Sequence, residues 1–315
     1  MKKRKLEANK LHSSRKRRNR KYTMTLCLML LPGLVCLFLF NYLPMGGAVI
    51  AFKDYKPLKG IWGSAWCGLK NFEFFFSSQD AARTIRNTVL YSVGFLILDL
   101  ILGVLVAILL YNLKSKAGIK VYHTAILMPQ FLSIVIVSFL VYAFLSPSYG
   151  FLNRIIVALG GDAISWYSMP KYWPWILVIV HCWMALGTGS LYYYAALTGI
   201  DPSLFDSADL DGANAFQRAW HICIPELIPI IVMMLILGIG RIFNDDMGLF
   251  YQVPRNTGML YSATDTINTY TYRALLDGNL SKSAAVGLFQ SFTGLCLVVG
   301  ANGLIRKISP ENSMF

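Results

Sequence analysis

The stretch that decides the fold is Thr198–Pro229, TGIDPSLFDSADLDGANAFQRAWHICIPELIP, a polar segment between two long apolar runs. Asp201 followed by Pro202 predicts the start of a short helix. Asp is a favoured N-cap, and proline loses nothing at the first helical position, where its missing N–H needs no partner. Gly212 then allows a sharp turn, and a second helix is expected from Ala213 to about residue 222. The segment therefore predicts a helix–turn–helix elbow between two membrane spans.

The elbow is acidic. Between Leu197 and Glu226 it carries five carboxylates and one arginine, a net charge of −4. An anionic inner leaflet repels such a segment, and a helix that lies on lipid would be rich in Lys and Arg instead. A protein partner is therefore the favoured contact, and a solvated connector is the alternative. The carboxylates are those of Asp201, Asp206, Asp209, Asp211 and Glu226.

Six apolar runs are long enough to cross a membrane. Of the 315 residues, 56% are hydrophobic and only 14% are charged, whereas soluble domains carry roughly a quarter charged residues. A hydrocarbon core of about 30 Å needs about 20 apolar residues in a helix. The sequence therefore predicts an all-α, polytopic membrane protein with six transmembrane helices, over Met24–Tyr42, Thr88–Tyr111, Thr124–Phe144, Trp173–Ala196, Leu227–Phe243 and Ala284–Ile305.

The basic residues set the expected orientation. Residues 1–22 contain eleven Lys or Arg and one Glu, directly before the first apolar run. This pattern is typical of a cytoplasmic anchor on anionic membrane lipid rather than of a tail that binds nucleic acid. With six spans, both termini are then cytoplasmic. The expected division is a basic tail (1–22), a first transmembrane helix with an outer segment (23–86), a core domain (87–307) containing the cytoplasmic loop 198–226, and a C-terminal tail (308–315).

The sequence contains no motif for catalysis or metal binding. There is no Gly-Lys dipeptide and hence no P-loop, no His-Glu-x-x-His and no Cys/His metal spacing. His181 and Ser190 share one predicted helix, but nine residues at about 100° each place them on opposite faces, which argues against a serine enzyme there. The chain is therefore expected to be non-catalytic and to hold no metal or cofactor of its own.

Asp99 lies near the middle of the second predicted span. An intramembrane carboxyl is a functional candidate, for example the proton site of a secondary transporter. Because no second acid lies in a span to form a proton relay, a packing residue that hydrogen-bonds to a neighbouring helix is the favoured interpretation. A proton-coupled secondary transporter using Asp99 is the alternative function, and a receptor or scaffold without transport is a third.

One pattern in the elbow resembles a known motif. The spacing Asp206-Ser207-Ala208-x3-Gly212-x9-Ile222-x-Ile224-Pro225 is similar to the EAA loop of ABC importer permeases, usually Glu-Ala-Ala-x3-Gly-x9-Ile-x-Leu-Pro. It departs from that pattern conservatively at positions 206, 207 and 224. Flanking segments resemble the carbohydrate-uptake permeases of the maltose type, and most of all the branch that imports oligosaccharides: Tyr42–Met45, Ala51–Tyr55, Gly199–Pro202, Asp211–Ala213 and Gly240–Phe243.

This resemblance implies a type I ABC importer permease fold, which translocates a sugar or oligosaccharide by alternating access across the bacterial cytoplasmic membrane. The implied assembly contains a second homologous permease, two cytoplasmic ATPase subunits that bind ATP and Mg, and an extracellular solute-binding protein. The elbow would be the coupling loop, seated in the ATPase and moved as a rigid body. The resemblance assigns ATPase coupling to Asp206, Ser207, Ala208, Asp211, Gly212, Ala213 and Pro225.

The resemblance also implies a sugar pocket built from the spans that flank the coupling loop. His181 and Trp183 lie in the fourth span, and Arg241, Asn244 and Asp245 end the fifth. Trp183 would stack on a sugar face, polar groups would bind hydroxyls, and Arg241 would pair bidentately with the carboxylate of an acidic sugar. The alternatives are helix packing for Trp183 and an ion pair between Arg241 and Asp245.

Overall fold

The computed structural model describes residues 22–113 and 115–308. The basic tail expected over 1–22 and the C-terminal tail expected over 308–315 fall almost wholly outside these residues. Five described helices are long and apolar enough to cross a membrane, and a bent pair supplies a sixth, which confirms the all-α, polytopic class. The five are the first helix (Tyr22–Phe52), α5 (Gln79–Tyr111), α9 (Trp173–Leu197), the helix Ala215–Gly240, and α16 (Leu280–Ile308).

The third expected span is broken, so the expectation of one continuous helix over Thr124–Phe144 is wrong. Its two halves meet at 96°. Pro129, which has no N–H to donate to the helix, lies in a short 3-10 turn, and the two residues after that turn are extended. The Ser133 hydroxyl then accepts from the Val135 N–H at 3.4 Å and caps the second half. The elements are α6 (Lys116–Leu127), η4 (Met128–Phe131) and α7 (Ile134–Leu145).

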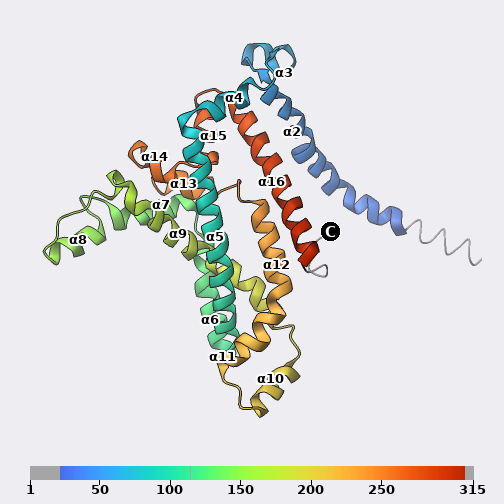
Figure 1. Ribbon diagram of the computed structural model, residues 1–315, viewed down its shortest axis with the longest axis vertical. Helices are drawn as coiled ribbons and strands as arrows, with labels where there is room; N and C mark the ends of the chain where they lie inside the picture. Colours follow the sequence, from blue (N-terminus) through green and yellow to red (C-terminus); the bar gives the residue numbers. More distant parts are fainter. Residues whose placement is uncertain (1–21, 114, 309–315) are drawn as a thin grey trace, which may run out of the picture.

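Figure 1 shows the elbow at one end of the bundle, some of the short elements at the other end, and others projecting to one side. The elbow consists of α10 (Pro202–Leu210) and α11 (Ala215–Arg218). The expected domain boundary at 86/87 is a position that α5 crosses, and the division of the chain stays a prediction. The short elements are β1 (Lys53–Asp54), η3 (Pro57–Lys59), α3 (Gly60–Gly63), β2 (Ala65–Trp66), α4 (Lys70–Ser77), α8 (Phe151–Ala158), η5 (Trp166–Ser168), η6 (Pro170–Tyr172), α13 (Met247–Gln252), η8 (Gly258–Leu260), α14 (Tyr261–Thr264) and α15 (Ile267–Leu276).

The first helix diverges from the rest of the bundle (Figure 1). None of its apolar window is buried. Its last turns are η1 (Phe38–Tyr42), α2 (Leu43–Met45) and η2 (Gly46–Phe52), and η2 packs against α16. The Tyr55 N–H donates to the Ser281 hydroxyl at 2.9 Å and fastens this junction. The apolar surface of the first helix is therefore left for lipid or another chain to cover.

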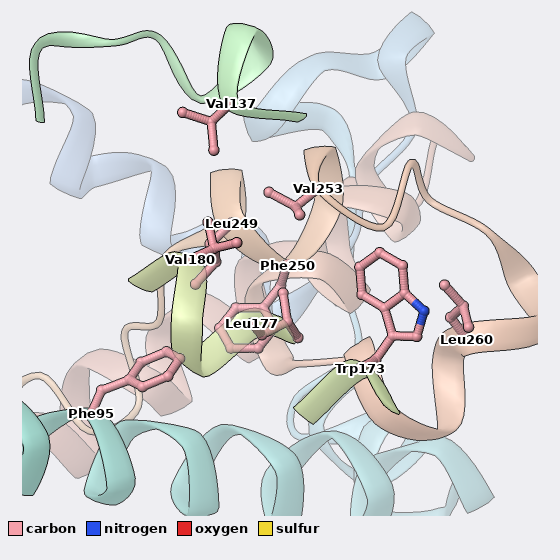
Figure 2. Close-up of a cluster of buried hydrophobic side chains, with 9 residues drawn as sticks. All are labelled: Phe95, Val137, Trp173, Leu177, Val180, Leu249, Phe250, Val253 and Leu260. Carbon is pink, nitrogen blue, oxygen red and sulfur yellow. The ribbon is translucent and has the colours of Figure 1, made fainter. Parts of the chain in front are cut away.

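The helices α5 and α9 form the central pair of the bundle. Gly187 of α9 lies against α6, where a Cβ atom would be 2.6 Å from the Ile126 carbonyl oxygen, so only glycine permits this approach. Figure 2 shows the main core, where side chains from both central helices meet α13. Its buried members are Phe95, Val137, Trp173, Leu177, Val180, Leu249, Phe250, Val253 and Leu260.

A buried carboxylate ties α5 to α15. Asp265 is almost fully buried and accepts from Arg83 Nη2 at 2.6 Å and from Arg273. The Asn87 amide donates to the Asp265 backbone carbonyl at 3.0 Å. A buried charge is tolerated only when it is paired and hydrogen-bonded. This cluster is therefore structural, and it fixes the N-terminal end of α5.

Replacing that carboxylate tests its structural role. Asp265→Ala leaves Arg273 without its acid and weakens the pairing of Arg83, so the expected loss is about 3–5 kcal/mol of folding free energy. The control is Asp80→Ala, because Asp80 also pairs with Arg83, at 2.8 Å, but is half-exposed; its expected loss is at most about 1 kcal/mol. Thermal unfolding of the detergent-purified protein measures both, and equal losses would contradict the assignment.

Candidate functional site

The elbow has the predicted shape. α10 begins at Pro202, and the Asp201 carboxylate accepts from the Ser203 N–H at 3.0 Å as its N-cap. Gly212 takes φ +72°, a left-handed conformation that L side chains rarely adopt. The second helix, expected from residue 213, begins at residue 215, because Asn214 and Gln217 form a capping box there.

The second limb of the elbow is the beginning of a membrane helix. α11, the π-helical turn η7 (Ala219–Cys223) and α12 (Ile224–Gly240) run without a break. Pro225 is the second residue after the π-helical turn, and this wider turn accommodates the missing proline N–H. Displacement of α11 is therefore carried straight into α12.

Direct contacts hold the two limbs together and to the bundle. Arg218 Nη1 donates to Asp209 Oδ1 at 2.5 Å across the turn. Phe205 of α10 packs against Tyr111 of α5, with ring centroids 5.3 Å apart. Beneath them lies a buried cluster that joins α5, α9 and α12: Ala107, Tyr193, Leu197, Cys223 and Leu227. The elbow is thus anchored to three membrane helices.

Several predicted coupling residues come together in a pocket. It has a volume of about 340 Å³ and lies between the limbs. Asp206 and Ser207 lie on the exposed side of α10 outside this pocket, and the Ser207 hydroxyl donates to the Ser203 carbonyl at 2.8 Å. Pro225 is also exposed and lies outside it. The predicted residues in its lining are Ala208, Asp211, Gly212 and Ala213, with Gln217 and Arg218 beside them.

Two aromatic side chains are exposed on the second limb. Phe216 and Trp220 stack with ring centroids 6.4 Å apart, and both are more than half-exposed. Phe216, Trp220 and Cys223 follow one another at four- and three-residue spacing on this limb, and of the three only Cys223 is buried. Large exposed aromatic rings beside a polar pocket form a surface suited to another protein.

The residues predicted for sugar binding fall into two places. In α9, His181 Nε2 lies 3.1 Å from Asp99 Oδ1 of α5, a pairing that the sequence pattern did not predict. Trp183 lies two positions further, about 200° around the helix, and is partly exposed. The other three, Arg241, Asn244 and Asp245, follow the end of α12. Among the described residues, no hydrogen bond or ion pair joins this second group to the first.

An amide network surrounds the second group. Asn268 Nδ2 donates to Asn244 Oδ1 at 3.2 Å and to the Asp245 carbonyl at 2.7 Å. Gln290 Nε2 of α16 donates to Asn268 Oδ1 at 2.8 Å and to the Phe243 carbonyl at 2.6 Å. Sequence reasoning missed Asn268 and Gln290. The signal for Gln290 was available, because it is an amide within an otherwise apolar span.

Asp245 is the unusual member of this group. Both carboxylate oxygens are buried, and within the described part of the chain neither has a hydrogen-bond partner. Burial raises the pKa of Asp245 to about 6, against a smaller lowering by Thr266 and Asn268. No ion pair joins it to Arg241 among the described residues, so the predicted alternative of an Arg241–Asp245 pair is not formed. A buried, unpaired carboxyl is poised to take a ligand hydroxyl or another donor.

The raised pKa of Asp245 predicts a pH dependence. The folded protein binds this proton more tightly than the unfolded chain does, so protonation of Asp245 stabilises the fold. This stabilisation, about 3 kcal/mol in the free energy of unfolding, is fully present below pH 4 and is lost as the pH rises through 6. Asp245→Asn removes the titration, and the variant should be more stable than wild type above pH 6 and equal to it near pH 4. Thermal unfolding from pH 4 to 8 checks this, and parallel profiles for both proteins would contradict it.

Comparison with known proteins places this geometry in a family. Residues 99–310 match the family of binding-protein-dependent transport system inner membrane components. The chain belongs to this family. It is 36% identical to the protein LplB of Bacillus subtilis (strain 168) over 288 residues, which cover 91% of this chain and 90% of LplB. It is also 36% identical to the polygalacturonan/rhamnogalacturonan transport system permease protein YteP of the same organism over 292 residues, which cover 91% and 89%.

Solved structures agree with this assignment. A bacterial ABC transporter involved in the import of the acidic polysaccharide alginate superposes with a TM-score of 0.83 and 31% identity, covering 94% of this chain and 99% of that one. The same kind of transporter in complex with a pentasaccharide-bound periplasmic protein gives a TM-score of 0.82. The chain is therefore a multi-pass membrane permease subunit of an ABC importer. This favours ATP-driven import over the proton-coupled alternative built on Asp99.

Proposed function

We propose that this permease is one of two homologous membrane subunits of an ATP-driven importer of acidic oligosaccharides. One of two ATPase subunits binds this elbow and the other binds the elbow of the second permease, while an extracellular solute-binding protein docks at the opposite end. ATP and Mg²⁺ are bound by the ATPase subunits and not by this chain. The two permeases alternate between inward-open and outward-open states as the ATPases close and separate.

The elbow is the observation that carries this proposal. It projects beyond the bundle (Figure 1), and it offers a pocket with an acidic edge beside the exposed Phe216 and Trp220. Because Arg218 and Asp209 lock its limbs and α11 continues into α12, a push on the elbow rotates the membrane helices instead of bending a loop. Asp206 and Asp211, both exposed, supply acceptors for the ATPase surface.

The substrate class follows from the groups at the other end of α12. Arg241 is exposed and free to bind a sugar carboxylate bidentately, and the Asn244–Asn268 amides suit hydroxyls. Asp245 supplies a buried carboxyl. YteP is named for polygalacturonan and rhamnogalacturonan, and the structural neighbour imports alginate. These names support an acidic oligosaccharide for this chain as well, with His181 further along the path. Trp183 lies about 200° around α9 from His181, so it does not share that position.

Uptake by the intact assembly tests the function. The complex is purified in detergent with its copurifying chains, reconstituted into liposomes, and offered polygalacturonan, alginate and maltodextrin digests, with internal product measured by mass spectrometry. We expect ATP-dependent accumulation of an acidic digest, insensitive to a protonophore, and an ATPase among the copurifying chains. Uptake without ATP that a protonophore stops would contradict the proposal.

Changing the bend of the elbow tests its coupling role. Gly212→Pro forces φ to about −65° where the backbone needs +72° and removes the N–H that donates to the Asp209 carbonyl. We expect uptake to fall at least tenfold while membrane insertion is retained and ATP hydrolysis no longer responds to substrate. Gly212→Asn, which tolerates a left-handed backbone, should keep most of the uptake.

A matched control lies away from the elbow. Gly160 also has a positive φ, +83°, with open space around it, and it follows α8. Gly160→Pro imposes the same backbone conflict away from the elbow, and coupling should stay intact. Loss of coupling in both variants, or normal transport in Gly212→Pro, would remove the elbow from the mechanism.

A further inference from the structure

The central helices carry an ionisable pair inside the membrane. Asp99 lies in α5, and His181 lies in α9 about 12 Å along that helix from its outer end. The two oxygens of Asp99 lie 3.1 and 3.2 Å from His181 Nε2. The imidazole also stacks flat on Phe95, with centroids 3.8 Å apart and an interplanar angle of 4°. Phe95 belongs to the buried core shown in Figure 2, so the imidazole is held on one face and at one edge.

The pair is open to its surroundings. The Asp99 side chain is 40% exposed and that of His181 is 18% exposed. A charged group that faces lipid at this depth costs about 2.5–3.5 kcal/mol or more, so intramembrane acids face protein or water. The opening beside Asp99 therefore points to a polar environment in the assembled transporter.

The exposed apolar residues of α5 and α9 lie on helix faces other than those that carry Asp99 and His181. On α5 the exposed apolar residues include Ile97, Ile101 and Leu105, and on α9 they include Ile179 and Trp183. Positions 97 and 101 each lie two residues from Asp99, and 179 and 183 each lie two residues from position 181. Two residues correspond to about 200° around a helix. The Asp99 and His181 edge is thus distinct from the faces that suit lipid.

The hydrogen-bond geometry defines what the imidazole offers. A carboxylate only accepts hydrogen bonds, so the hydrogen in this contact lies on Nε2. The neutral tautomer with hydrogen on Nε2 has Nδ1 as an acceptor, and no hydrogen bond to Nδ1 is formed among the described residues. An acceptor held rigidly at a polar edge is suited to a hydroxyl donor, and carbohydrates present such donors in abundance.

We propose that Asp99 is the positioning residue for His181, holding the imidazole in one tautomer on the water-facing wall of the translocation pathway so that Nδ1 accepts from a carbohydrate hydroxyl. This inference rests on the proposed carbohydrate function. Asp99 acts through His181 and does not carry a proton across the membrane.

Uptake kinetics separate positioning from simple structural support. With the polygalacturonan digest as probe, Asp99→Ala and His181→Ala should each raise the half-saturating concentration by up to about tenfold, the worth of one hydrogen bond between neutral groups, with little change in maximal rate. The double variant should be no worse than the worse single variant. Asp99→Asn keeps an acceptor for Nε2 and should recover most of the affinity. Ile101→Ala, on the apolar face of α5, is the control and should match wild type.

Either of two kinetic results would overturn the inference. The first is a fall in maximal rate or in assembled protein with an unchanged half-saturating concentration. The second is a double variant whose half-saturating concentration rises by the product of the two single effects, which would mean that Asp99 and His181 act independently. If wild type takes up no carbohydrate at all, the proposed function fails instead, and the placement of the pair is decided by the labelling below.

Thiol labelling tests the placement without any substrate. In a cysteine-free background, an Asp99→Cys variant of the full assembly is exposed to a charged, membrane-impermeant methanethiosulfonate, with Ile101→Cys as its matched control. We expect the Asp99→Cys variant to react and the Ile101→Cys variant to stay unmodified. Reaction of the Ile101→Cys variant alone, or of neither, would place Asp99 away from water and overturn the inference.

Discussion

The contact between the Arg218 guanidinium and the Asp209 carboxylate is the constraint on which the mechanical account depends. It closes the turn at Gly212 and fixes α10 against α11. Since α11 continues into α12, the second limb has no hinge before its membrane helix, and Phe205 seats α10 of the first limb on Tyr111 of α5. An exposed ion pair alone adds little stability. Its value here is geometric, because packing beneath the elbow has already ordered both limbs.

Three acidic side chains, those of Asp265, Asp99 and Asp245, show how the surroundings of a carboxylate decide its role. Asp265 is buried and saturated by two arginines, so it holds structure. Asp99 has one partner and an open side, which suits positioning at a water-filled path. The carboxylate oxygens of Asp245 are buried and have no hydrogen-bond partner among the described residues, and burial raises the pKa of Asp245 to about 6. A carboxylate thus pairs with arginines to hold structure at one position, orients a histidine at a second, and is buried without a hydrogen-bond partner among the described residues at a third.

Structural features that depend on neighbouring residues in the sequence were predictable, and contacts between residues far apart in the sequence were not. The Asp201 cap and the Gly212 turn were foreseen because they involve neighbouring residues. The break at Pro129 was missed because a run of apolar residues hides it from hydropathy alone. The Asp99–His181 pair joins positions 82 residues apart, and the contacts of Asn268 depend on the packing of three segments. The coupling and sugar-binding roles of the predicted residues stay predictions.

The most direct test of the account is the distance between two spin labels, one at Leu210 on α10 and one at Leu109 on α5. Both side chains are exposed, and pulsed electron paramagnetic resonance measures the distance in the reconstituted assembly. An elbow fixed to its membrane helices predicts one narrow distance distribution that is the same with and without ATP. A broad distribution, or one that shifts when ATP binds, would mean that the segment bends as a loose connector, and it would contradict force transmission through it.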